Sequence, residues 1–281
     1  MGGVEQRRTS HASPAHRVYR EAVILGAAAY AILLQIANPG VGRGVRDHSD
    51  FAHRPVDRLR GTMVFVYGVV FGTEEEAERV SRIVRAVHKR VAGPGYSAQD
   101  PDLQVWVAAT LYACDVHVYE LVCGPLSPED KDEIYRCAAV FATSLGCPPE
   151  RWPATRADFE RYWARMIDSL EVDDTARAVA RDLFHPANPF VRALMRIQHL
   201  LAAGLLPAHV RDGFGLEWGP ARRRRFNRLV AVVRALYPRL PLAVRTLPRD
   251  YYLHELRRDA ARGGRRRRSL RRRGAPAAQR R

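Results

Sequence analysis

The amino-acid sequence predicts an all-α fold: a single globular multi-helix domain followed by a disordered, Arg-rich C-terminal tail. Apolar residues recur at helical spacing along most of the chain, proline and glycine stand where helices begin and end, and no stretch shows the alternation typical of a strand. With 281 residues and 47% apolar composition, the chain is long enough to bury one large core. We therefore expect a flexible segment over residues 1–14, one domain over 15–256 and a disordered basic tail over 257–281.

Start and stop signals delimit the first two predicted helices. The first runs from Pro14 to Ala37 and stops before Pro39, because proline disfavours the α conformation in the residue that precedes it. A glycine-rich loop is expected from Gly40 to Arg54. The second helix runs from Pro55, since proline suits the first turn, to Phe71.

The third helix follows the capping box that begins at Thr73, carries His88 and closes at Gly93. The later helices are delimited by the same kinds of signal. They are predicted from Pro101 to Gly124, Pro128 to Leu145, Arg156 to Leu170, Asp174 to Phe184, Pro189 to Ala203 and Pro220 to Tyr237, with one or two short helices over Pro241–Leu256.

The formal net charge of +16 is located mostly in the tail. Residues 256–281 contain 12 Arg and one Asp, or +11, which leaves 16 − 11 = +5 for the rest of the chain. No aromatic residue interleaves these arginines, so no specific nucleic-acid binding is expected. We expect the tail to be a solvated terminus, and the alternative is that it makes weak contact with an anionic surface.

Cysteine usage and hydropathy indicate a cytoplasmic protein, with peripheral membrane association as a secondary expectation. The four cysteines form no C-x-x-C pair and lie in helical patterns, as reduced packing thiols do. The longest apolar run, Ala22–Leu34, has 13 residues, which is short for a membrane span, and no Ala-x-Ala cleavage pattern follows it.

Arg58 and Thr62 are one helical turn apart and share a face that continues toward apolar positions. We expect this face to point inward. A buried arginine needs an acceptor, and either an anionic cofactor group or a carboxylate such as Asp47 or Asp50 would satisfy it.

Two histidines lie on apolar helical stripes. His88 follows Val84 by four residues on a stripe that also includes Val87, and His117 lies on the stripe of the helix that starts at Pro101. Each could be a hydrogen-bonded core residue or a ligand. Haem needs only one strong protein ligand, so a lone inward histidine is compatible with haem where it would not be with zinc. His48, in a polar loop motif, looks structural or substrate-facing.

The sequence contains no motif for several other classes of site. No Glu-x-x-His occurs, which weakens a di-iron bundle, and His254-Glu255 lacks the second histidine of a zinc protease motif. The run Gly40-Val-Gly-Arg-Gly follows a predicted helix and lacks Lys-Ser/Thr, so it is not a nucleotide-binding loop.

A family resemblance is carried by short motifs spread from about Tyr19 to Leu256. They are Asp47-His48-Ser49-Asp50-Phe51, Pro55 with Arg58-Leu-Arg-Gly-Thr62, Val70-Phe71-Gly72-Thr73, Val87-His88-x-x-Val91, Tyr96-Ser-Ala-x-Asp100-Pro101, Leu103-x-x-Trp106-Val107, Gly124-Pro125-Leu126-Ser127, Leu145-Gly146, Pro153-Ala154-Thr155 and Leu205-Leu206-Pro207. In these motifs the chain resembles the domain of unknown function 2236, the family of MpaB-type oxygenases and latex-clearing rubber oxygenases. The resemblance implies an all-α fold, haem b, and oxidative cleavage of carbon–carbon double bonds in isoprenoid chains by dioxygen.

The resemblance also assigns roles. His88 corresponds to the proximal iron ligand, with His117 the second candidate, and Arg58 and Thr62 correspond to residues that line the haem pocket. Rubber oxygenases have a distal lysine where this chain has Gly61, and many relatives have histidine where it has Asn38.

The sequence therefore predicts a haem b-dependent oxygenase in which His88 binds the iron and Arg58 and Thr62 are the catalytic and pocket residues. Its partners would be dioxygen and an apolar, lipid-like unsaturated substrate. The alternative is a non-enzymatic haem-binding or structural helical module that its basic tail tethers to an anionic membrane or nucleic acid.

Overall fold

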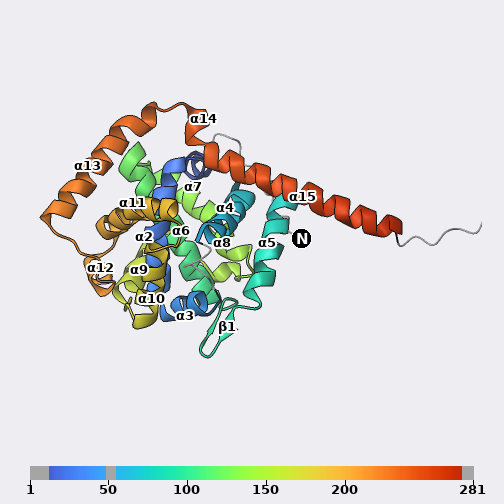
Figure 1. The fold of residues 1–281 in the computed structure, drawn as a ribbon, viewed down its shortest axis with the longest axis horizontal. Helices are drawn as coiled ribbons and strands as arrows, with labels where there is room; N and C mark the ends of the chain where they lie inside the picture. Colours follow the sequence, from blue (N-terminus) through green and yellow to red (C-terminus); the bar gives the residue numbers. More distant parts are fainter. Residues whose placement is uncertain (1–12, 49–54, 274–281) are drawn as a thin grey trace, which may run out of the picture.

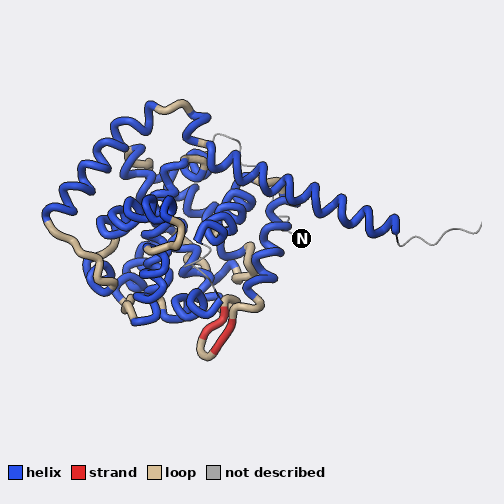
Figure 2. Tube along the Cα trace, viewed as in Figure 1, coloured by secondary structure: helices blue, strands red, loops and turns tan. Residues whose placement is uncertain are grey.

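The computed structural model describes residues 13–48 and 55–273, and it confirms the all-α fold. Figures 1 and 2 show helices throughout this part of the chain, with one small two-stranded hairpin. The elements are α1 (Pro14–Tyr19), η1 (Ala22–Ala27), α2 (Ala28–Ala37), α3 (Pro39–His48), α4 (Pro55–Phe71), α5 (Glu74–His88), β1 (Ala92–Gly93), β2 (Tyr96–Ser97), α6 (Pro101–Cys123), α7 (Pro128–Ala138), α8 (Val140–Thr143), η2 (Pro149–Arg151), α9 (Arg156–Asp168), α10 (Asp174–Phe184), α11 (Pro189–Leu205), α12 (Ala208–Gly213), α13 (Pro220–Leu236), η3 (Tyr237–Arg239), α14 (Leu242–Arg245) and α15 (Leu247–Arg273).

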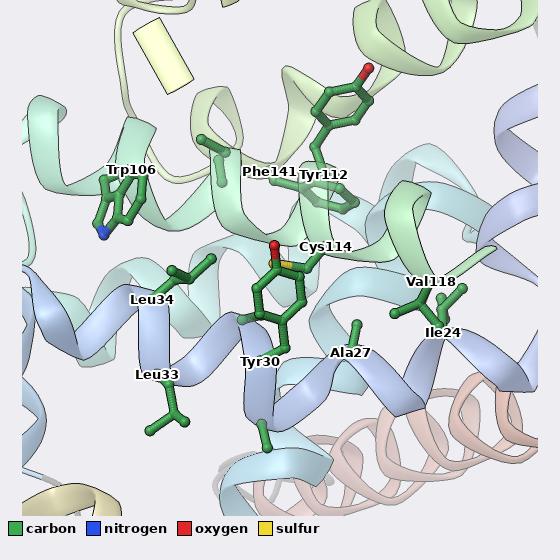
Figure 3. Close-up of a cluster of buried hydrophobic side chains, with 14 of the residues drawn as sticks. Ile24, Ala27, Tyr30, Leu33, Leu34, Trp106, Tyr112, Cys114, Val118 and Phe141 are labelled. Carbon is green, nitrogen blue, oxygen red and sulfur yellow. The ribbon is translucent and has the colours of Figure 1, made fainter. Parts of the chain in front are cut away.

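The core is built around α2 and α6, which pack against each other and are apolar on most of their faces. Figure 3 shows Leu34 and Tyr30 of α2 on the side that faces Trp106 and Cys114 of α6. Trp106 is fully buried and stacks on Trp163 of α9 with 5.5 Å between ring centroids. Burial of several such large side chains, each worth roughly 1.5–3 kcal/mol, makes this layer the main source of stability.

The prediction of one continuous first helix is wrong. The segment from Pro14 to Ala37 breaks after Tyr19, because Glu21 adopts an extended conformation and η1 then begins. Glu21 is buried and accepts a hydrogen bond from the Tyr237 hydroxyl over 2.9 Å. A partner 216 residues away in the chain therefore fixes the break, and no local pattern could reveal it.

The glycine-rich loop predicted from Gly40 is also wrong, since residues 39–48 form helix α3. Asn38 makes this possible by accepting the backbone N–H of Gly40 over 3.0 Å, as a helix N-cap does. Gly42 is needed because a Cβ there would lie 2.6 Å from the carbonyl oxygen of Ile36. The rest of the predicted loop, residues 49–54, lies outside the described residues.

Smaller differences concern element ends. The fifth predicted helix is divided at Ala139 into α7 and α8, and β1 pairs antiparallel with β2 where only a turn was expected. The starts of the helices at Pro101, Pro128, Arg156, Asp174 and Pro189 agree with the prediction, because a capping side chain precedes each of them.

Helix α15 begins on the body and then projects away from it (Figure 1). Leu256 is the last buried residue among the side chains that the structure describes. Residues 1–12 and 274–281, which include most of the predicted flexible segment and the end of the predicted disordered tail, lie outside the described residues.

Of the described helices, α6 is the one that is long and apolar enough to cross a membrane by itself, and 56% of its apolar window is buried inside the fold. The segment from Ala22 to His48 passes the same test only as a pair of helices bent by 108°.

Candidate functional site

The antiparallel pair of α4 and α5 brings the start of α4 beside the end of α5. The tight connection depends on Gly72, where a Cβ would lie 2.3 Å from the carbonyl oxygen of Gly68. The predicted capping box then starts α5: Thr73 Oγ1 accepts the backbone N–H of Glu76, and the Glu76 carboxylate accepts that of Thr73. These local contacts position Arg58 and His88 at the same end of the hairpin.

His88 is the last residue of α5 and is half-buried, with Nδ1 enclosed. Nδ1 has no hydrogen-bond partner among the described residues. Burial, and secondly the positive charge of Arg58, hold the pKa of His88 below its usual value. The imidazole is therefore neutral at neutral pH, which is the protonation state that binds a metal.

Arg58 is accessible to solvent, yet the surrounding protein lowers its pKa by desolvation. This combination is typical of a side chain that has protein on several sides but is still reached by solvent. The charge of Arg58 acts on His88, which is 30 positions later in the sequence, so the two residues lie within the range of electrostatic interaction at this end of the hairpin.

Thr62 lies one turn after Arg58, and its hydroxyl donates to the Arg58 carbonyl oxygen over 3.1 Å. The prediction that this turn points into the core is wrong, because Thr62 is exposed and α4 becomes buried only from Phe65 onward. Among the described residues, a Cβ at Gly61 would meet no atom within 4 Å. Residues 57–62 are exposed in the described structure.

The stripe that carries His88 is only partly buried. Val80 is buried, whereas Val87 is 56% exposed. The inward orientation predicted for this stripe is therefore correct in the first half of α5 and wrong near its end.

Asp47, one of the two carboxylates considered as a partner for Arg58, has other partners. It pairs with Arg46 and accepts a hydrogen bond from the Tyr96 hydroxyl over 2.7 Å. The same hydroxyl lies 3.3 Å from Nε2 of His48, so His48 joins α3 to β2, in line with its structural interpretation. Asp50, the second carboxylate, lies outside the described residues.

His117 was expected on the apolar stripe of α6, but its side chain is exposed. Its ring meets the edge of Tyr30 with 5.9 Å between centroids. Desolvation by the neighbouring protein still lowers its pKa.

Asp115 of α6 was not identified from the sequence. Burial raises the pKa of its carboxyl well above the usual range. Its neighbour Cys114 is hydrogen-bonded to Tyr30. The available signal was a single acidic residue in the apolar run from Leu103 to Tyr119.

Among the described residues, no group of three or more His, Cys, Asp and Glu side chains is placed to hold a metal ion. The imidazole of His88, whose Nδ1 has no partner among the described residues, is a single neutral donor.

Comparisons with known proteins agree with the resemblance seen in the motifs. The family model described as the catalytic domain of the ER-bound oxygenase mpaB/B′ and rubber oxygenase matches residues 16–235. Two proteins, from Mycobacterium bovis and Mycobacterium tuberculosis, are each 33% identical to this chain over 248 residues, which cover 83% of this chain and 96% of the relative. Both are named as uncharacterized, and no solved structure matches. On the extent of these matches, the chain belongs to the MpaB and rubber oxygenase catalytic-domain family.

Proposed function

We propose that the protein is a haem b-dependent oxygenase that acts on an apolar, unsaturated, isoprenoid-like substrate. The family is one of oxygenase catalytic domains, which use dioxygen and a substrate. The observation that carries the finer proposal is His88, whose enclosed Nδ1 has no partner among the described residues and whose pKa is lowered by burial and by the charge of Arg58.

The residues around His88 fit haem b. The imidazole would bind the iron, Arg58 would pair with a propionate, and Thr62 would hydrogen-bond at the wall of the pocket. Bound haem would supply the iron at which dioxygen is activated.

The protein's contribution is to bind and orient. Thr62 fixes the turn that carries Arg58 through its bond to the Arg58 carbonyl oxygen. Burial, and secondly the positive charge of Arg58, hold the pKa of His88 below its usual value and so favour the neutral imidazole that binds metal. The buried side chains Phe65 and Val66, on the next turn of α4, provide an apolar continuation that suits a hydrocarbon substrate. Gly61 places no side chain on the side where rubber oxygenases have a lysine, so distal ligation would differ in this protein.

We also propose that the protein is cytoplasmic. Its four cysteines, all of them in the described part of the chain, are free, and Cys114 and Cys147 are buried as packing thiols. This usage fits a reducing compartment.

The visible spectrum of the haem-supplied protein tests the cofactor and its ligand. The wild type should show a Soret band, and His88→Ala should lose or shift it. His117→Ala is the matched control and should leave the band unchanged. Absence of the band from the wild type would remove the haem proposal, and a band that moves only in His117→Ala would transfer the ligand to that residue.

Oxygen uptake by the haem-loaded protein tests the activity. Consumption that depends on an added polyisoprenoid, with carbonyl products, would support an oxygenase of this substrate class. A haem protein that consumes no oxygen with any unsaturated lipid would instead be a haem-binding module, the alternative class.

A further inference from the structure

The region of the fold from Pro220 to Tyr251, here called the C-terminal arm, comprises α13, η3, α14 and the start of α15. Thr246 is the one buried residue in this range, all of which is described. Figure 1 shows α13 running along the outer edge of the molecule. The arm is therefore held on the body without becoming part of the core.

The arm carries an unusual share of exposed apolar side chains. Seven of the 13 large exposed hydrophobic residues among the described residues lie within it. They are Val232, Leu236, Leu240, Leu242, Val244, Leu247 and Tyr251. Single exposed apolar residues are ordinary on protein surfaces, but a cluster of this size marks a surface that another apolar phase covers.

The same segment is strongly basic. It contains nine arginines and one acidic residue, Asp250, which gives 9 − 1 = +8. Arg228 precedes Val232 by four residues and so lies on the same helical face, where its guanidinium adjoins the apolar stripe. Exposed leucines and valines interspersed with arginines are the composition of an element that lies in the interface of an anionic membrane.

We propose that the C-terminal arm docks the protein on the surface of an anionic phospholipid bilayer, with its apolar side chains in the acyl boundary and its arginines on the lipid phosphates. The proposal does not depend on haem or on the oxygenase activity. It places membrane contact in the folded arm, in addition to any contact made by the Arg-rich tail.

Charge favours a bilayer over the other occupants of this surface. A symmetric dimer would bring two identical arms of charge +8 together, which is repulsive. A nucleic acid would satisfy the arginines but would leave Leu236, Leu240 and Leu242 facing a polar backbone. An anionic bilayer satisfies both the charged and the apolar sets of side chains.

Polar contacts orient the arm for this role. Tyr237 donates to the buried Glu21 over 2.9 Å and accepts the backbone N–H of Val23 over 3.1 Å. Arg245 lies 3.4 Å from the same carboxylate. These contacts fix η3 and α14 on the body, so Leu240 and Leu242 remain outside without being packed.

The test is vesicle flotation of the full-length chain with phosphatidylcholine alone and with added phosphatidylglycerol, at low salt and at about 1 M salt, where the Debye length falls to about 3 Å. We expect binding to the anionic vesicles that persists in part at high salt, because apolar insertion is not screened. The triple variant Leu236→Ser, Leu240→Ser, Leu242→Ser should bind the anionic vesicles at least about tenfold more weakly than the wild type, although its charge is unchanged.

The matched control replaces three apolar residues of comparable exposure outside the arm, Leu59→Ser, Ile83→Ser and Val87→Ser, and should bind as the wild type does. A circular dichroism spectrum equal to the wild type shows that each variant is folded. A second variant, Arg234→Gln with Arg239→Gln, should reduce the preference for anionic over neutral vesicles.

Three results would overturn the proposal. The first is a wild type that does not float with anionic vesicles. The second is a triple serine variant of the arm that binds as tightly as the wild type, which would leave the tail as the lipid contact. The third is a wild type that sediments as a dimer while the triple serine variant sediments as a monomer, which would make the arm an interface between two copies.

Discussion

Removal of the Glu21 carboxylate should destabilise the fold, because this one side chain ties the N-terminal break to the C-terminal arm. Glu21 is 3% exposed, accepts the Tyr237 hydroxyl and pairs with Arg20 and Arg245 at 3.6 Å and 3.4 Å. Breaking a fully buried pair by removing one partner costs about 3–5 kcal/mol. Both arginines retain some contact with water, so we expect about 2–3 kcal/mol for Glu21→Ala.

Thermal unfolding followed by circular dichroism measures this effect. For a domain of this size the loss corresponds to a fall of about 5–10 °C in the melting temperature. Glu21→Gln keeps an acceptor for Tyr237 and should lose about half as much. Tyr237→Phe should cost about 1–2 kcal/mol, and the double variant with Glu21→Ala should cost less than the sum, because the two side chains share one hydrogen bond.

The exposed Glu171, changed to alanine, is the control and should stay within about 0.5 kcal/mol of the wild type. Equal stabilities of Glu21→Ala and Glu171→Ala, or additive effects of Glu21→Ala and Tyr237→Phe, would refute the assignment of this network.

Further outcomes concern two glycines and the pair of Arg58 and His88. Gly61→Ala should raise the free energy of unfolding by about 0.5–1 kcal/mol, because alanine is the better helix former and its Cβ would meet no described atom within 4 Å. Gly204→Ala should lower the free energy of unfolding, because its Cβ would lie 2.4 Å from the ring of Phe226. Denaturant unfolding of both variants measures these changes. Arg58→Gln should raise the pKa of His88, measured by NMR titration of the imidazole, since one cause of its lowering is removed. Because the pKa of His88 in the folded protein lies below the usual 6.5, the stability of the fold should fall as the pH drops from about 6.5 through the pKa of the folded state, and His88→Ala should flatten this dependence. An unchanged pKa of His88 in Arg58→Gln would contradict an electrostatic effect of Arg58 on His88.

The sequence by itself determined the helix starts, the family and the candidate residues. Helix starts follow from contacts within about four residues, such as the bond between Thr73 and the Glu76 backbone, so local patterns reveal them. Asn38 shows the limit of this approach, because its amide caps α3 in a stretch whose glycines indicated a loop.

Only the tertiary structure decided the environment of each polar group. The break at Glu21, the lowered pKa of His88, the raised pKa of Asp115 and the exposure of the C-terminal arm all arise between segments distant in the chain. Desolvation and electrostatic interaction depend on which atoms surround a group in space, and periodicity along one helix specifies a face without specifying what covers it. For that reason the sequence identified His88 and Arg58, and the fold determined that they lie together on an open side of the molecule.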